Sequence, residues 1–199
     1  VSGNIHQIKN CFIIGKIIAV SDYVGGLIGK VEGARYKNAN KDLMICDHNI
    51  SYCYFSGIVS GNNNVGGLIG YKKYGNISCC YSAGSVFGAS NVGGLIGHND
   101  ASSTVKTSVA IHSRISASVE NVNRIVGKND GTIAAVGSTD ENKSYNRTIV
   151  MLKGAVQEIE DNQMNGMKIA TNINKFISLD KVDAIFSMWN MMSNVAASM

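Results

Sequence analysis

The hexapeptide Val-Gly-Gly-Leu-Ile-Gly occurs three times in the chain, at residues 24–29, 65–70 and 92–97. A degenerate fourth copy, Val-Asn-Arg-Ile-Val-Gly at residues 122–127, keeps the valine, the apolar pair and the final glycine. The copies begin 41, 27 and 30 residues apart, and self-similarity at such a period is the signature of a repeat architecture.

A second block precedes the hexapeptides at a nearly fixed distance. Residues 49–54 (Asn-Ile-Ser-Tyr-Cys-Tyr) align with residues 76–81 (Asn-Ile-Ser-Cys-Cys-Tyr), so Cys53 and Cys80 share one repeat position, each 12 residues before a repeat valine. Cys11 precedes the first repeat valine by 13 residues. The long first interval holds an insertion at residues 30–47, which is polar and rich in Gly, Lys and Asn, and we expect it to form a loop.

The repeats alternate short runs of β-formers with Gly and Asn turn residues, which predicts strands rather than helical repeats. The chain has no proline, as expected where interior strands must donate their N–H groups to the next strand. We expect an all-β fold, a right-handed parallel β-helix (β-solenoid) of about four to five coils stacked ~4.8 Å apart, with a C-terminal cap that is helical in part. The expected domains are residues 1–137 for the repeats and residues 138–199 for the cap.

Each repeat position has a physical reason. The apolar residues of the hexapeptide fill the interior, or one points inward while another packs outside. The double glycine permits either close backbone approach or a positive φ at a corner. Asn64, Asn91 and Asn121 each precede a repeat valine, and Tyr23 precedes the first; asparagine tolerates the left-handed conformation, and stacked asparagines can hydrogen-bond from coil to coil. The repeat-defining residues are Val24, Gly25, Gly26, Leu27, Ile28, Gly29, Val65, Gly66, Gly67, Leu68, Ile69, Gly70, Val92, Gly93, Gly94, Leu95, Ile96, Gly97, Cys11, Cys53 and Cys80.

The Gly-Leu-Ile-Gly core, with Val-Gly before it and Asn-Ile-Ser-x-Cys-Tyr upstream, resembles the GLUG motif. The resemblance covers roughly residues 1–137. Repeats of this family occur in large bacterial surface proteins, namely adhesins, filamentous-haemagglutinin-like proteins and the non-catalytic part of IgA1-specific metallopeptidases. The resemblance implies an extracellular, cell-surface β-helical module and supplies no active site.

The C-terminal segment differs from the repeats. Residues 149–199 hold the only tryptophan, Trp189, and large apolar side chains recur at three- and four-residue spacing from Phe176 to Met192. This spacing predicts an amphipathic helix that Ser178 could cap. We favour a cap that closes the end of the solenoid, because the polar face is mixed in charge; a helix that binds a membrane surface or a partner is the alternative.

The five cysteines predict free thiols rather than disulfides. On a solenoid, Cys11, Cys53 and Cys80 would stack as an interior ladder. Their Cβ atoms would point the same way rather than at each other, which favours buried free thiols over disulfides. Cys46, in the insertion, is the expected exposed thiol, with Cys46–Cys79 pairing as the alternative.

The titratable residues form no catalytic or metal-binding pattern. The four histidines lack an HExxH or comparable spacing, and no C-x-x-C pair exists. Asp22, Asp47 and Asp100 are expected in different coils, so no acid/base pair of the kind that glycosidases need is encoded. We therefore expect no metal, no cofactor and no enzymatic activity.

The amino-acid composition argues against a disordered chain, a membrane span and nucleic-acid binding. Of 199 residues, 45% are hydrophobic and 16% charged, which argues against disorder, and no run of about 18 apolar residues predicts a membrane span. The net charge of +4 comes from scattered basic residues without interleaved aromatics, so nucleic acid is not expected to bind. The chain begins at Val1 without a signal peptide, so we expect a processed protein or an excised segment.

The leading functional hypothesis is a secreted or surface-anchored β-solenoid that serves in adhesion or structural presentation. It would hold loops such as residues 30–47 towards a protein or glycan of a host or neighbouring cell. One alternative is the non-catalytic repeat segment of an IgA1-protease-like protein. A second is a subunit of an extracellular fibre, since an open strand edge allows self-association by stacking.

Overall fold

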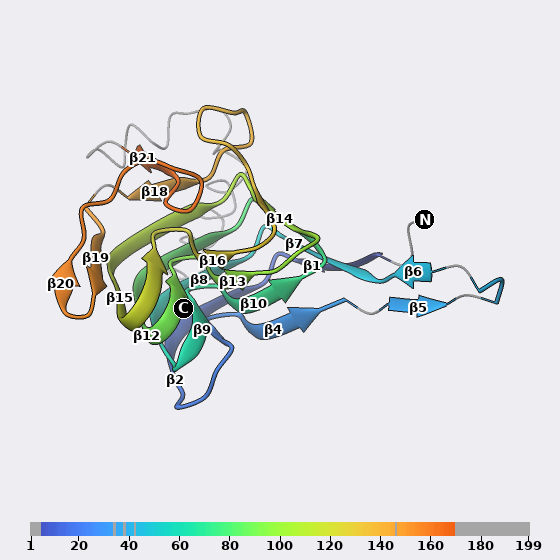
Figure 1. The fold of residues 1–199 in the computed structure, drawn as a ribbon, viewed down its shortest axis with the longest axis horizontal. Coiled ribbons are helices and arrows are strands. Elements are labelled where there is room, and N and C mark those ends of the chain that lie inside the picture. The colour runs from blue at the N-terminus through green and yellow to red at the C-terminus, as the bar shows by residue number, and fades with distance from the viewer. Residues whose placement is uncertain (1–4, 34, 38, 42, 146, 170–199) are drawn as a thin grey trace, which may run out of the picture.

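The computed structural model describes residues 5–33, 35–37, 39–41, 43–145 and 147–169, and within them every regular element is a β-strand. The all-β class expected from the sequence is therefore confirmed. The predicted C-terminal helix, from Phe176 to Met192, lies outside the described residues. Figure 1 shows the strands gathered in adjacent sheets, with one hairpin projecting to the side.

Three parallel sheets make up most of the molecule, and we call them sheets A, B and C. Sheet A contains, in spatial order, β1 (Ile5–Lys9), β7 (Asp47–Ser51), β11 (Gly75–Ser78), β14 (Ser103–Lys106) and β17 (Thr132–Ile133). Sheet C contains β4 (Ile28–Glu32), β10 (Ile69–Lys73), β13 (Ile96–Asn99) and β16 (Val126–Asn129).

Sheet B is the largest and holds ten strands. Its main path is β2 (Phe12–Ile18), β8 (Tyr54–Ser60), β12 (Tyr81–Gly93), β15 (Val109–Asn123), β18 (Lys143–Tyr145) and β21 (Met167–Ile169). The short strands β3 (Val24–Gly25) and β9 (Asn63–Gly66) extend it beside β12, and β19 (Ile149–Leu152) and β20 (Ala155–Val156) extend it beside β15.

The register pairs equivalent residues of successive repeats. The repeat valines pair in parallel in the order Val24, Val65, Val92 and Val122, and the next apolar position pairs in the order Ile28, Ile69, Ile96 and Val126. Each of the first four repeats thus adds one strand to sheet A, one or two to sheet B and one to sheet C, and each later one hydrogen-bonds to the repeat before it. The repeat alignment made from the sequence is confirmed by these pairings.

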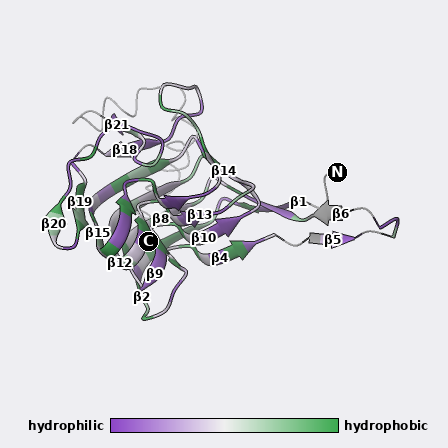
Figure 2. Cartoon of the chain, viewed as in Figure 1, coloured by the Kyte–Doolittle hydropathy of each residue, from purple (hydrophilic) through white to green (hydrophobic). Residues whose placement is uncertain are grey.

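The core lies between the sheets and is built from the hexapeptides. Val65, Leu68 and Ile69 are completely buried, as are their equivalents in the next repeat. All three apolar residues of the hexapeptide therefore point into the interior in these two copies. Burial of one such side chain stabilises the fold by about 1.5–3 kcal/mol relative to exposure. Figure 2 shows hydrophobic and hydrophilic residues alternating along many of the strands, as strands with one buried face require.

The insertion at residues 30–47 is more regular than the expected loop. After β4 leaves sheet C, β5 (Arg35–Lys37) and β6 (Leu43–Ile45) pair antiparallel, and β7 then returns the chain to sheet A. Figure 1 shows this hairpin projecting away from the three sheets. Strand pairing within so polar a segment gave no sequence signal.

Parallel pairing continues past residue 137. Thr132 pairs with Thr104, and further along Lys143 pairs with Val109 and Ile149 with Arg114. The backbone carbonyl of Met164 then accepts hydrogen bonds from the N–H groups of Ile125 and Val126 in the fourth hexapeptide. Among the described residues, no helix is long and apolar enough to cross a membrane.

Candidate functional site on the outer face of sheet C

Two rows of polar and aromatic side chains run across the four strands of sheet C. The first row, in register, is Lys30, Tyr71, His98 and Lys128. The second row begins with Glu32 and Lys73, which pair with each other, and ends with Asp100 and Asp130, which follow β13 and β16. The charged side chains and His98 are partly exposed, Tyr71 is buried with 8% of its surface exposed, and Lys72 and Asn99 in the same strands are completely buried. We call the two rows together the sheet C face.

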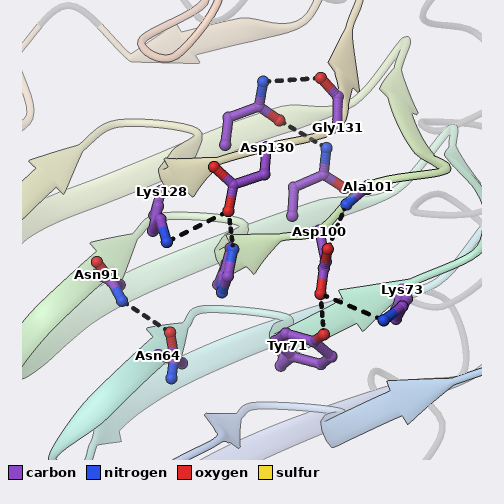
Figure 3. A network of polar contacts seen from close by, with 12 residues as sticks. Asn64, Tyr71, Lys73, Asn91, Asp100, Ala101, Lys128, Asp130 and Gly131 are labelled. Carbon is purple, nitrogen blue, oxygen red and sulfur yellow. Dashed lines mark hydrogen bonds and ion pairs between the residues drawn. The ribbon is translucent and has the colours of Figure 1, made fainter.

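Two carboxylates hold the sheet C face together (Figure 3). Asp100 accepts a hydrogen bond from the Tyr71 hydroxyl and lies 3.9 Å from the Lys73 ammonium. Asp130 lies 2.8 Å from Nε2 of His98 and 3.2 Å from Nζ of Lys128. Each carboxylate therefore links neighbouring strands as well as neighbouring rows.

Aromatic contacts extend the face towards the first repeat. The rings of Tyr23 and Tyr71 meet edge to face with centroids 5.6 Å apart, and Tyr71 meets His98 in the same way at 5.2 Å. Nζ of Lys30 lies 4.9 Å from the Tyr23 ring centroid and 3.0 Å from the Glu32 carboxylate. Such ring and cation–ring contacts restrict the side chains that they join.

The electrostatics keep these groups in defined charge states at neutral pH. Burial and the bond to Asp100 raise the pKa of Tyr71, so its hydroxyl stays a donor. Burial alone would raise the pKa of Asp100, but hydrogen bonds from Tyr71 and the Ala101 N–H lower it overall. The hydrogen bond to His98 lowers the pKa of Asp130. The face thus presents fixed carboxylates, ammonium groups and ring edges.

An asparagine ladder lies beside the sheet C face. Asn91 donates a hydrogen bond from Nδ2 to Oδ1 of Asn64, and Asn121 donates to Asn91. All three have positive φ, as does Tyr23 at the same position of the first repeat. The left-handed conformation and the side-chain ladder expected from the sequence are both confirmed. Figure 3 shows the Asn64–Asn91 bond next to the rows of sheet C.

The double glycine of the repeat serves close backbone approach. A Cβ added to Gly66 would collide with the backbone oxygen of Ile69 and the backbone nitrogen of Gly97. One added to Gly67 would collide with the backbone oxygen of Gly94. Neither Gly66 nor Gly67 has a positive φ, so the alternative explanation of this pair, a positive φ at a corner, is wrong. Close approach here lets the chain turn from sheet B into sheet C.

The cysteine column lies at the junction of sheets A and B, away from the sheet C face. Cys53 and Cys80 are buried, Cys11 is half-buried, and all five cysteines of the chain are free thiols. Each of the three thiols contacts the backbone oxygen two residues before it, at 3.2–3.3 Å. The predicted interior ladder of free thiols is therefore confirmed for Cys53 and Cys80, whereas Cys11 in the first repeat is not fully buried. Cys46 and Cys79 do not pair.

The column continues into the later repeats with polar residues in place of cysteine. Ser108 follows Cys80, since Tyr81 pairs with Val109, and Asn142 follows Ser108. The Ser108 hydroxyl lies 3.2 Å from the backbone nitrogen of Cys80, which donates to it, and the Asn142 oxygen accepts from the Ser108 N–H at 3.0 Å. The alignment of residues 107–111 with the cysteine block is confirmed by this pairing, whereas Asn142 had no signal in the sequence.

Buried polar groups inside the repeats were also missed. Lys72 is completely buried and donates to the backbone oxygen of Tyr74. Its register partner Asn99 is equally buried, and the Asn99 Nδ2 donates to Oδ1 of Asn129 at 2.7 Å. His112 is 1% exposed and contacts the backbone oxygen of Gly94 at 2.7 Å. The motif search had no signal for these positions because they lie outside the repeated blocks.

Within the described ranges, no group of three or more His, Cys, Asp and Glu side chains is placed to hold a metal ion. The predicted site residues instead frame the sheet C face: each hexapeptide leads into a strand of sheet C, which carries the rows. Comparisons with models of protein families, with curated proteins and with solved structures find no match to the chain.

Proposed function

We propose that the chain is a non-catalytic, GLUG-type β-solenoid module that acts in adhesion at an extracellular cell surface and binds its ligand on the sheet C face. The observation that carries the proposal is the register that places Lys30, Tyr71, His98 and Lys128 in one row, with Asp100 and Asp130 fixed between rows. Support for a winding solenoid comes from the first four repeats, each of which adds strands to sheets A, B and C in turn.

The face suits binding because its groups are already positioned. Strand pairing fixes their backbones, and the contacts of Asp100 and Asp130 restrict their side chains. A ligand therefore meets groups that need little ordering, which lowers the entropic cost of binding. In a solenoid, successive members of one row would lie about 4.8 Å apart, the separation of paired strands.

The ligand class that this face fits best is a hydroxyl-rich glycan. Carboxylates accept hydrogen bonds from sugar hydroxyls, and ammonium groups donate to them. The ring of Tyr23, which is 40% exposed, can pack against the apolar face of a sugar. Asp130 and Lys128 are about half exposed and offer both kinds of polar group. The ligand would lie across the strands, along the row direction.

A glycan array tests this function directly. The purified chain should bind at least one class of glycan, and the Lys128→Ala/Asp130→Ala variant should bind it at least about tenfold more weakly, a loss of ~1.4 kcal/mol. Thr104→Ala on sheet A is the matched control and should bind as the parent does. Absence of glycan binding, or binding that the double substitution leaves unchanged, contradicts the proposal.

A hairpin replacement tests whether the ligand binds the sheet C face or the hairpin, and a cleavage assay tests the non-catalytic role. Replacement of residues 35–45 by a short turn should leave glycan binding intact if the sheet C face carries it, whereas loss of binding would place the ligand on the hairpin.

Incubation with IgA1 or with acidic polysaccharides should give no cleavage at any metal content. Metal-dependent cleavage that a histidine substitution abolishes would contradict a non-catalytic role.

A further inference from the structure

Strand β2 leaves one end of sheet B open. Among the described strands it pairs with β8 alone, and Phe12, Ile14 and Ile18 are 53%, 70% and 61% exposed. At the other end of the sheet, β15 is covered by β18 and β19, and Ile125 is completely buried. An exposed apolar strand with an unpaired edge is a site for pairing with another chain.

The backbone groups on the open side of β2 can be assigned. Tyr54 of β8 donates its N–H to the oxygen of Cys11, and Ala19 donates its N–H to the oxygen of Ser60. In a parallel pair, every second residue of a strand directs both its N–H and its C=O to the same neighbouring strand. Because Cys11 and Ala19 bond to the β8 side, the odd-numbered residues of β2 direct their backbone groups to β8. The groups of the even-numbered residues therefore face the open side, and these residues are Phe12, Ile14, Lys16 and Ile18.

The same four residues are complementary to themselves in antiparallel pairing. Two copies of β2 related by a twofold axis at Gly15 place Phe12 opposite Ile18 and Ile14 opposite Lys16. Both members of each pair have free backbone groups, so each pair exchanges two hydrogen bonds. The inward-facing Ile13 then lies opposite Ile17, which keeps the apolar interior continuous across the axis.

Gly15 is consistent with a neighbour at this position. A Cβ added to Gly57 would collide with the backbone oxygen of Gly15, and one added to Gly84 would collide with that of Gly57. A Cβ added to Gly15, the first glycine of this column, meets nothing within 4 Å. The space that the preceding strand fills in the later repeats is thus open beside β2.

We propose that the β2 edge is a homodimerisation surface whose occupant is a second copy of this chain, paired antiparallel about Gly15. The pairing continues the strand-to-strand interface already present within the chain. A twofold arrangement uses the same edge on both copies, so the assembly stops at a dimer. The projecting hairpin leaves the β2 edge accessible, since Figure 1 shows it extending away from that strand.

Sedimentation equilibrium in reducing buffer, compared across variants, tests the surface. The parent chain should be a dimer in the micromolar range. Ile14→Pro removes an N–H that no described residue accepts, and proline is tolerated on edge strands, so this variant should stay folded and become monomeric. Ile14→Ala keeps the N–H and should still dimerise; circular dichroism and Tm verify that both variants are folded.

Cross-linking tests the register. Gly15→Cys has room for its side chain and lies opposite itself across the axis, where Cα atoms ~4.5 Å apart allow a disulfide. Mild oxidation should give a covalent dimer, whereas Lys16→Cys, which lies opposite Ile14, should give little. A parent chain that is monomeric throughout, assemblies larger than dimers, or equal cross-linking of the two variants would overturn the proposal.

Discussion

The side-chain amide of Asn91 lies between those of Asn64 and Asn121, donating to the first at 2.9 Å and accepting from the second at 2.8 Å. All three residues have φ between 52° and 54°, a conformation that costs most side chains about 1–2 kcal/mol. Asparagine therefore does two things at this position: it tolerates the backbone conformation and it joins one repeat to the next. Tyr23 shares the conformation but has no amide, so the ladder begins at Asn64.

Two substitutions at Asn91 separate these effects. Asn91→Gly keeps the left-handed conformation and removes both side-chain hydrogen bonds, and we expect it to lower the free energy of unfolding by about 1–2 kcal/mol. Asn91→Ala should cost about 1 kcal/mol more, because alanine also resists the positive φ. Urea denaturation measures both values. Equal destabilisation by the two variants would show that the backbone conformation is not strained.

Gly66 tests the close approach of repeats. A Cβ there meets the backbone of Ile69 and Gly97, which cannot move aside as a flexible side chain could, so Gly66→Ala should destabilise the chain by about 3 kcal/mol. Gly15→Ala is the matched control at a concentration below the dimer range, since its added Cβ meets nothing within 4 Å in the chain itself, and it should change the free energy of unfolding by less than about 0.5 kcal/mol. Thermal unfolding of both variants makes the comparison.

The parts of the fold that the sequence predicted are those repeated in it. The hexapeptide aligned the strands correctly, and the cysteine column and the asparagine ladder followed from that alignment, because equivalent residues of a parallel repeat pair directly. The right-handed winding and the surface function stay predictions.

The sheet C face could not be predicted in the same way. Its rows combine residues that differ from repeat to repeat, such as Lys30, Tyr71 and His98, so no self-similarity marked them. Asp100 was noted only as isolated in its own coil, yet its contacts with Tyr71 and Lys73 arise between strands. Such contacts require a register that is accurate to one residue on both sides of the insertion.

Lys72 is predicted to reduce stability at neutral pH. Burial lowers its pKa to about 8, and no carboxylate among the described residues lies within ion-pair distance of its Nζ. Below pH 8 the buried ammonium stays charged at a desolvation cost, so Lys72→Met should raise the free energy of unfolding by about 2 kcal/mol at pH 7. The advantage should shrink as pH rises from about 8 towards the unfolded value near 10.5, since the folded amine is then neutral.

Chemical denaturation at pH 7 and pH 10 measures this difference. Lys73→Met is the control, because that side chain is partly exposed and pairs only at 3.9 Å with Asp100. It should change stability little at either pH. A Lys72→Met variant that is less stable than the parent at pH 7 would show that the bond to the Tyr74 oxygen outweighs desolvation.

His112 occupies the position of Gly84 in the next repeat, with its ring enclosed in the interior. Its Nε2 donates to the Gly94 oxygen, while Nδ1 has no partner within the described residues. Burial lowers the pKa of this imidazole to about 4, from an ordinary value of 6.5. The folded chain therefore binds this proton less readily than the unfolded chain does.

Stability should consequently fall as pH drops from about 6.5 to 4, because only the unfolded chain gains the His112 proton in that window. The full shift corresponds to about 3 kcal/mol, which urea unfolding at a series of pH values can measure. His112→Gln keeps a donor for the Gly94 oxygen but does not titrate, so its stability should vary much less between pH 6.5 and 4. Asp100, Asp130 and Glu141 have lowered pKa values, and their stabilisation is lost at more acidic pH in both proteins. A parent slope that persists in His112→Gln would assign the acid sensitivity to another group, with His48, whose pKa is also lowered by burial, the next to substitute.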